Sequence, residues 1–133
     1  MTTTPAKPRP LSPHLGIYKP QITTVMSITN RVTGIALALG LPAFVVWLAL
    51  IASGPAAYAS FLDICRTKTA QVFLIGWTFS FFYHFWNGIR HLCWDAGWFL
   101  DMPAVRWTGW LALFLTLSGT IVIWLKIWGY IPT

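Results

Sequence analysis

One stretch decides how the fold of this chain is interpreted: FYHFWNGIRHLCWD, at residues 82–95. It overlaps the end of an apolar run, residues 69–89, that contains no Asp, Glu, Lys or Arg. A run of about 20 such residues is long enough to cross a bilayer as a helix. His84 then lies at membrane depth, where an ionisable side chain is costly and indicates a functional site.

Two more apolar runs, residues 32–53 and 107–125, are also free of charged side chains. Charged residues make up 9% of the chain, against roughly 25% in soluble domains. We therefore predict an all-α membrane protein with three transmembrane helices, at about residues 32–53, 69–89 and 107–125. Residues 1–31 are predicted to be a Pro-rich N-terminal arm and polar lead-in on the inner membrane face, and residues 32–133 a three-span membrane domain.

The net charge of +6 is spread between the apolar runs. This pattern argues against a nucleic-acid partner and favours contact with anionic phospholipid headgroups. Three spans put six cations on the side of the N-terminus and three on the other side. An excess of cations marks the cytoplasmic or matrix side, so the N-terminus is predicted to lie there. The six are Lys7, Arg9, Lys19, Arg31, Arg90 and Arg106; the three are Arg66, Lys68 and Lys126.

Polar residues recur every three or four positions along the second predicted span, which places them on one face of a helix. They are Ser80, His84, Asn87 or Gly88, and His91, and Asp95 continues the series into the next loop. A polar face at membrane depth has to meet a partner helix or a cofactor instead of acyl chains.

The depth of His84 suits a haem. It lies seven residues below His91, which is roughly 10 Å in a helix. Iron at that depth lets the haem propionates reach a layer of interfacial cations formed by Arg31, Arg90 and His91. A neutral imidazole is a good axial ligand for haem iron. The alternative is a histidine that hydrogen-bonds across helices, and the residues alone do not decide between the two.

No other histidine lies deep in a predicted span, because His14 is in the arm and His91 at the interface. A haem with two imidazole ligands would need its second ligand from another polypeptide. A three-span bundle is also thin for enclosing a macrocycle. Both points predict an obligate hetero-oligomer.

Ser27 and Arg31 are four residues apart at the start of the first span, and hence on one helix face. A hydroxyl and a guanidinium at the membrane boundary could bind a polar head with an apolar tail, such as a quinone. On the residues alone the structural interpretation is favoured, in which Arg31 snorkels and Ser27 caps a helix.

Three ordered blocks of the sequence resemble the cytochrome b membrane-anchor subunits of succinate dehydrogenase, respiratory complex II. They are RPLSPHL at residues 9–15 with Ile17-Tyr18, then Ser27-Ile28 with RVTG at residues 31–34, and then H-x-x-N-G-I-R-H-L-x-W-D at residues 84–95. The first block is similar to the mitochondrial and alphaproteobacterial branch.

The resemblance implies a subunit of a bacterial inner membrane or mitochondrial inner membrane. It implies half of a heterodimeric bundle that binds haem b and ubiquinone beneath an iron–sulfur subunit and a flavoprotein subunit. Carried over, the cofactor residues are His84 as axial iron ligand, Arg31 and His91; the quinone residues are Ser27, Ile28, Arg31 and Asp95. No catalytic residue is implied, since the chain is non-catalytic alone and forms part of a succinate:quinone oxidoreductase.

The sequence departs from the family pattern at position 30, which is often histidine and is Asn30 here. Asparagine can donate a hydrogen bond but cannot carry charge. Two alternatives for the whole chain are a purely structural membrane anchor and a small proton-coupled transporter subunit that uses His84 as a relay. The second is disfavoured because the predicted spans contain no carboxylate to continue a proton path.

Overall fold

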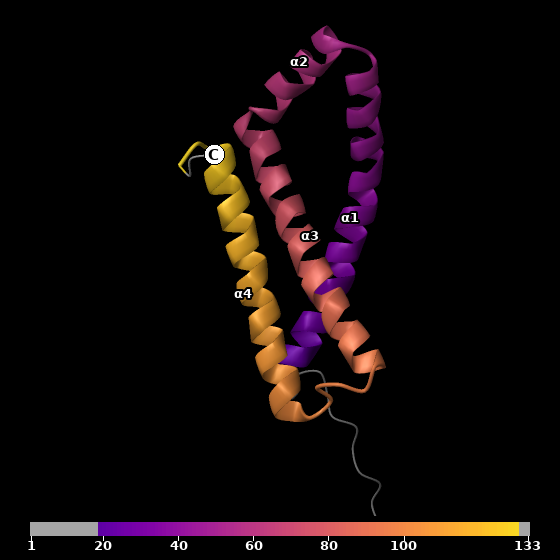
Figure 1. The fold of residues 1–133 in the computed structure, drawn as a ribbon, viewed down its shortest axis with the longest axis vertical. Helices are drawn as coiled ribbons and strands as arrows, with labels where there is room; N and C mark the ends of the chain where they lie inside the picture. Colours follow the sequence, from indigo (N-terminus) through magenta and orange to yellow (C-terminus); the bar gives the residue numbers. More distant parts are fainter. Residues whose placement is uncertain (1–18, 131–133) are drawn as a thin grey trace, which may run out of the picture.

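The computed structural model describes residues 19–130, and within this range the chain forms four α-helices. They are α1 (Ile22–Ala52), α2 (Pro55–Cys65), α3 (Lys68–Asp95) and α4 (Met102–Ile127). Figure 1 shows that α1, α3 and α4 are long and run antiparallel in chain order, while the short α2 joins the end of α1 to the start of α3. Residues 1–18 of the predicted N-terminal arm lie outside the described residues.

The predicted polar lead-in and first span form one continuous helix. Helix α1 has 31 residues and begins at Ile22, after Gln21, whose side chain makes no capping hydrogen bond. It passes through Pro42 without ending. Membrane helices tolerate an interior proline because neighbouring groups satisfy the freed carbonyl. The lead-in therefore extends the first predicted span by almost three turns.

The segment between the first two predicted spans is mostly helical. Helix α2 begins at Pro55, directly after Gly54, whose φ of 106° lies in the region that favours glycine. Proline suits the first turn of a helix because its missing N–H would have no partner there. Near its end Arg66 Nη1 lies 3.0 Å from Asp63 Oδ1, and both side chains are largely exposed.

Side-chain caps define where α3 and α4 begin. The Thr67 hydroxyl accepts a hydrogen bond from Ala70 N at 3.3 Å. In the same way Asp101 Oδ2 accepts from Ala104 N at 3.2 Å, in front of Pro103 in the first turn of α4. Each cap satisfies one of the amide groups that a helix start leaves free.

Helix α3 lies between α1 and α4 and packs on both. The buried face of α4 consists mainly of small and hydroxyl residues, a composition typical of close helix packing in membranes. Large apolar side chains instead point outward along all three long helices, for example Leu39, Phe73 and Phe114. The buried set on α4 is Ala104, Gly109, Ala112, Thr116, Thr120 and Trp124.

Two of the described helices, α1 and α4, are long and apolar enough to cross a membrane by length and composition. Helix α3 has 28 residues but is not one of the two. Its composition explains this, because Trp, Tyr, His and Asn lower its mean hydropathy while Phe, Ile and Leu raise it. The all-helical prediction is confirmed, and the span predicted for residues 69–89, in α3, stays a prediction.

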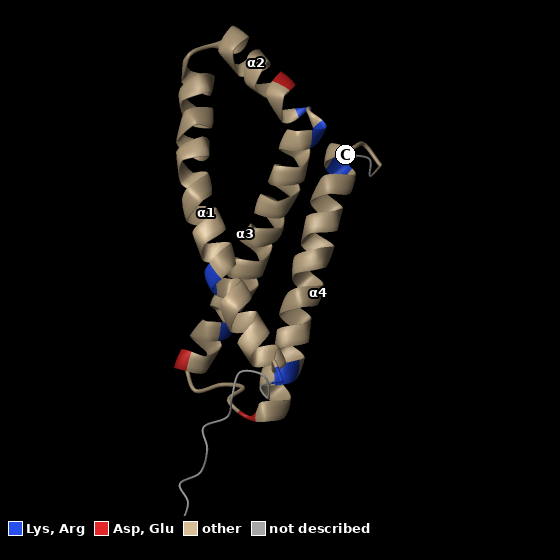
Figure 2. Cartoon of the chain, turned by 180° about the vertical axis from the view of Figure 1, so that it is seen from behind, with Lys and Arg blue, Asp and Glu red and all other residues tan. Residues whose placement is uncertain are grey.

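The charged residues of the described chain gather at the two ends of the bundle (Figure 2). Arg31, Arg90 and Arg106 lie toward the end where α3 stops and α4 begins, which we call the Asp95 end. Arg66, Lys68 and Lys126 lie toward the opposite end, which we call the α2 end. The helices thus separate these six cations into the two groups expected from the sequence.

Candidate functional site

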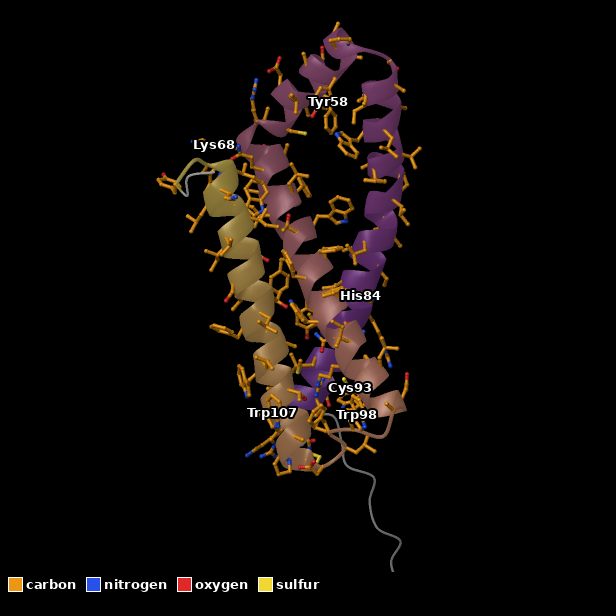
Figure 3. The ribbon with its side chains drawn as sticks, in the orientation of Figure 1. Tyr58, Lys68, His84, Cys93, Trp98 and Trp107 are labelled. Atoms are coloured by element: carbon orange, nitrogen blue, oxygen red, sulfur yellow. The ribbon has the colours of Figure 1, made fainter. Side chains whose placement is uncertain are left out.

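His84 is half-buried on α3, on the side toward α1 (Figure 3). Its Nδ1 lies 3.1 Å from the main-chain oxygen of Asn30 on α1. A carbonyl oxygen can only accept, so Nδ1 carries the hydrogen in this contact, and in the neutral imidazole Nε2 then keeps its lone pair. Metal-binding histidines have this arrangement, in which one nitrogen donates to a carbonyl and the other is free to coordinate.

Gly34 provides the space for the His84 ring. A Cβ atom on Gly34 would lie 3.0 Å from His84 Cε1 and 3.4 Å from Nδ1. Such distances are tighter than ordinary van der Waals contact, so a side chain here would push the ring away from α1. The glycine therefore lets the imidazole lie flat against the first helix, close enough to reach Asn30.

Asn30 holds this contact with its main chain, not its side chain. Its carbonyl oxygen also accepts a hydrogen bond from Thr33 Oγ1 at 3.0 Å. Its side-chain Oδ1 is buried and has no hydrogen-bond partner within residues 19–130. A buried polar atom without a partner is uncommon. Asn30 thus combines a main-chain oxygen that meets the imidazole with a side-chain oxygen that has no partner in residues 19–130.

Ser27, Ile28 and Arg31 lie in the first three turns of α1 and are exposed. The structure corrects one expectation, because Ser27 does not cap the helix: α1 begins five residues earlier, at Ile22. In the part of the chain that the structure describes, the Arg31 guanidinium makes no hydrogen bond or ion pair, nor does the Ser27 hydroxyl. Both groups are therefore available to a ligand.

His91 and Asp95 are exposed at the Asp95 end of α3. The His91 ring meets the edge of Trp94, with 4.9 Å between ring centroids. These two residues share the helix face of His84, but the described part of α1 does not cover them. They lie at the surface where the sequence placed them.

The buried stripe of α3 differs from the predicted polar stripe. Ser80 and Asn87 are buried as expected, together with Tyr83 and Arg90. His84 lies at the edge of this buried face. Tyr83 is absent from the predicted stripe, although the spacing of residues 80, 83, 87 and 90 follows the helical repeat.

Arg90 does not join the predicted layer of interfacial cations. Its side chain is only 7% exposed and turns toward α4. Nη2 donates to the Val105 carbonyl at 2.6 Å, and Nε donates to Thr108 Oγ1 at 3.0 Å. The guanidinium also stacks on Trp94, 4.1 Å from the ring centroid. Packing against α4, which sequence spacing cannot reveal, takes this cation into the bundle.

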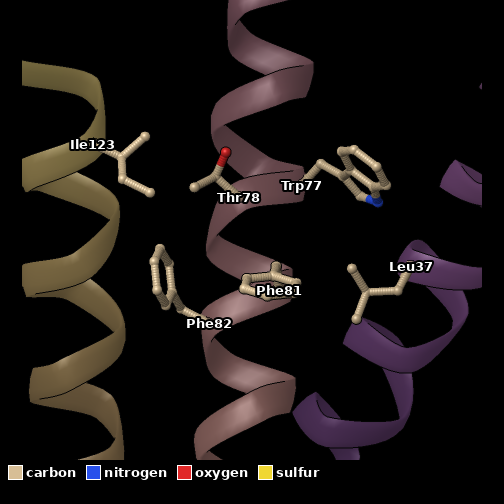
Figure 4. Close-up of a pocket in the computed structure, with 6 residues that line it drawn as sticks. All are labelled: Leu37, Trp77, Thr78, Phe81, Phe82 and Ile123. Carbon is tan, nitrogen blue, oxygen red and sulfur yellow. The ribbon is translucent and has the colours of Figure 1, made fainter. Parts of the chain in front are cut away.

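Two shallow grooves flank α3. The first has a volume of about 190 Å³ and is open across the face of α3 between α1 and α4 (Figure 4). The second has a volume of about 180 Å³ and lies between α3 and α4. Enclosed ligand sites usually measure about 300–1,000 Å³, so neither groove can enclose a macrocycle. The first is lined by Leu37, Trp77, Thr78, Phe81, Phe82 and Ile123.

A family model for the succinate dehydrogenase/fumarate reductase transmembrane subunit matches residues 5–123. The chain belongs to this family. It is 38% identical, over 117 residues, to the succinate dehydrogenase cytochrome b556 subunit of Rickettsia typhi. The aligned region covers 87% of this chain and 90% of that subunit. The chain is 40% identical, over 123 residues, to the cytochrome b560 subunit of Reclinomonas americana, with 88% and 85% covered.

The mitochondrial cytochrome b560 subunit of Homo sapiens is 38% identical over 121 residues, with 85% of this chain and 68% of the relative covered. The resemblance inferred from three sequence blocks is therefore confirmed, including its bacterial and mitochondrial branches. Membership of a transmembrane-subunit family also agrees with the apolar α1 and α4.

Proposed function

We propose that this chain is a membrane-anchor subunit of succinate dehydrogenase that binds haem b together with a partner anchor subunit and forms part of the ubiquinone-reduction site. The observation that carries the proposal is the His84 contact. Its Nδ1 is held by the Asn30 carbonyl, which leaves Nε2 as a ligand, in a chain whose relatives are named cytochrome b subunits.

The residues present fit one axial side of a haem. Gly34 leaves room for the imidazole against α1, and the Asn30 carbonyl fixes its orientation, so His84 Nε2 would hold the iron. Haem supplies one-electron redox chemistry when bound. Arg31 and His91 are exposed cationic or polar groups toward the Asp95 end and would bind the propionates.

The second axial ligand and the rest of the haem pocket would come from the partner anchor subunit. This follows from the small volumes of the two grooves and from the lack of another deep histidine in α1, α3 or α4. Helix α3 would cross the bilayer together with α1 and α4, since it lies between them and is long enough to do so. The excess of cations predicts that the Asp95 end faces cytoplasm or matrix, where the iron–sulfur and flavoprotein subunits dock.

The quinone site would lie at the same end, on the exposed first turns of α1. Ser27 and Arg31 would bind the polar head of ubiquinone, Ile28 would contact its apolar part, and Asp95 would belong to the polar layer around it. Electrons from succinate reach ubiquinone through the iron–sulfur subunit, and ubiquinone takes two electrons and two protons. The Arg31 guanidinium stabilises the negative charge that develops on a quinone oxygen.

Asn30 adds no charge to the proposed polar layer. A side-chain amide remains neutral, so any charge that a haem propionate meets on α1 would come from Arg31. The chain alone would not be a catalyst, because succinate oxidation belongs to the partner subunits. Phospholipid would cover the exposed apolar faces of the helices.

The experiment that tests the proposal is an absorption spectrum of the purified membrane complex. We expect a Soret band that co-purifies with this chain and difference bands of a b-type haem on reduction. A complex that contains the chain but shows no haem absorbance would contradict the proposal and leave the structural anchor or the transporter subunit.

A further inference from the structure

We propose that Arg90, Met26 and Gly109, which we call the Arg90 cluster, position the first turns of α1 and thereby place Ser27 and Arg31. The inference rests on the proposed quinone site, because it assigns the residues that hold that site in place. Arg90 is a positioning residue in this account and does not touch the quinone.

Arg90 joins α3 firmly to α4. Two of its nitrogens donate to the Val105 carbonyl and the Thr108 hydroxyl, both in the first two turns of α4. Thr108 Oγ1 in turn donates to the Ala104 carbonyl at 2.7 Å. The described chain offers this buried cation no carboxylate, so its charge is balanced only by carbonyl and hydroxyl oxygens and by the Trp94 ring. Such a side chain has a fixed geometry because each contact uses a different direction of the planar guanidinium.

Met26 connects this pair of helices to α1. It is 7% exposed, and its sulfur lies 4.0 Å from Arg90 Nη1. Its main-chain oxygen accepts a hydrogen bond from the Tyr83 hydroxyl at 3.4 Å. A Cβ atom on Gly109 would lie 2.6 Å from the Met26 sulfur, so the glycine leaves the notch in α4 that the methionine side chain fills.

The cluster matters for α1 because it contains the buried residue nearest to the start of that helix. Met26 and Thr33 are the only buried residues of α1. Met26 directly precedes Ser27, and Arg31 follows within two turns. A shift of Met26 therefore moves both proposed quinone-binding residues, and misplacement by about 1 Å can reduce rates by about a hundredfold.

The first test replaces Gly109 by alanine in the full complex. The added methyl group would force the Met26 sulfur out of its notch and away from Arg90. We expect Gly109→Ala to raise the KM for a ubiquinone analogue by about tenfold, with an unchanged rate of succinate oxidation by an artificial acceptor. Gly76→Ala is the matched control, because a Cβ atom there meets nothing within 4 Å. The double variant Met26→Ala with Gly109→Ala removes the clash without restoring the Met26 contact, so its KM should stay raised, and recovery of the affinity would overturn the positioning role of Met26.

The second test separates positioning from charge. Arg90→Lys keeps the positive charge but cannot make the contacts to Val105, Thr108 and Trp94 together. If Arg90 acts by position, Arg90→Lys and Arg90→Gln raise the KM by similar factors. Full function of Arg90→Lys would overturn the proposal, because it would show that charge alone suffices.

A structural readout keeps the inference independent of the quinone site. Hydrogen exchange of the amides of residues 22–31, measured by mass spectrometry on the intact complex, should be faster in Gly109→Ala than in Gly76→Ala. Unchanged exchange would overturn the positioning role. Faster exchange with an unchanged KM would instead support the cluster as the anchor of α1 and contradict the proposed location of the quinone site.

Discussion

At the scale of single residues, His84 could be selected from the sequence but its surroundings could not. Its depth in an uncharged run made it the candidate functional residue. Its hydrogen-bond partner is a main-chain oxygen 54 residues away, and any residue type could have supplied that atom. Gly34 was visible only as a small residue in the first span, and its contact with the imidazole depends on how α1 crosses α3.

Arg90 shows a second limit of sequence analysis at this scale. A cation beside the predicted membrane boundary was expected to point to the interface. In the structure it is buried and bound to α4, because carbonyl and hydroxyl oxygens of another helix are within its reach. The spacing of Ser80 and Asn87 indicated a covered helix face but not the helix that covers it.

The contact between Gly34 and His84 leads to the first prediction. Gly34→Ala places a methyl group 3.0 Å from His84 Cε1 and displaces the ring. Overpacking typically costs about 1–3 kcal/mol, so we expect haem retention in the purified complex to fall by about tenfold. Haem is measured as the ratio of Soret absorbance to protein. Gly88→Ala, on α3 with no atom near its Cβ, is the control, and equal haem content in the two variants would contradict the prediction.

Arg31 leads to a prediction about the quinone. Arg31→Ala removes a guanidinium that has no partner in the described chain and leaves the dehydrogenase chemistry of the other subunits intact. We expect ubiquinone reduction to fall by roughly a hundredfold, as for the loss of one charge-stabilising donor. Succinate oxidation with an artificial acceptor should change little. An equal loss in both assays would argue against a quinone role and for a general defect in assembly.

At the scale of helices, the uncharged runs of the sequence fall on the three long helices, but they do not mark where those helices begin and end. Residues 69–89 lie within α3 and residues 107–125 within α4. Helix α1 begins ten residues before the first uncharged run, because the polar stretch from Ile22 to Arg31 contains no helix breaker. The bounds of helix α2 were not predicted, since its 11 residues are too few for a periodic pattern to stand out.

Whether α3 crosses the membrane is the prediction that belongs to this scale. Thr67→Cys and Ala96→Cys place a thiol at each exposed end of α3, in a background where Cys65 and Cys93 are replaced by serine. An impermeant thiol reagent added from one side of sealed membranes should label only one of them. The cation count predicts that position 96 is labelled from the cytoplasmic or matrix side. Labelling of both positions from the same side would contradict a span.

At the scale of the whole molecule, the described chain has the features expected of one part of a larger assembly. Its largest apolar side chains point outward, its buried residues are mostly small or polar, and its grooves are shallow. The sequence predicted this incompleteness from a single deep histidine. Family membership names the kind of complex, while the residues that would complete the proposed haem pocket would belong to another polypeptide.

This incompleteness has a direct consequence for expression experiments. The chain produced without its partner anchor subunit should retain haem at no more than about a tenth of the level in the full complex, because only one axial ligand is present. Co-expression of the partner should restore the Soret band. Full haem content in the isolated chain would mean that it forms the whole site, for instance as a homodimer with two His84 ligands.

The central claim is that His84 is the axial haem ligand of this chain, and the reduced-minus-oxidised spectrum of the purified His84→Ala complex tests it most directly. Phe85→Ala, at an exposed neighbouring position, is the control for effects on assembly. We expect the b-type difference bands to be lost or reduced to about a tenth in His84→Ala and retained in Phe85→Ala. An unchanged difference spectrum in His84→Ala would contradict the account.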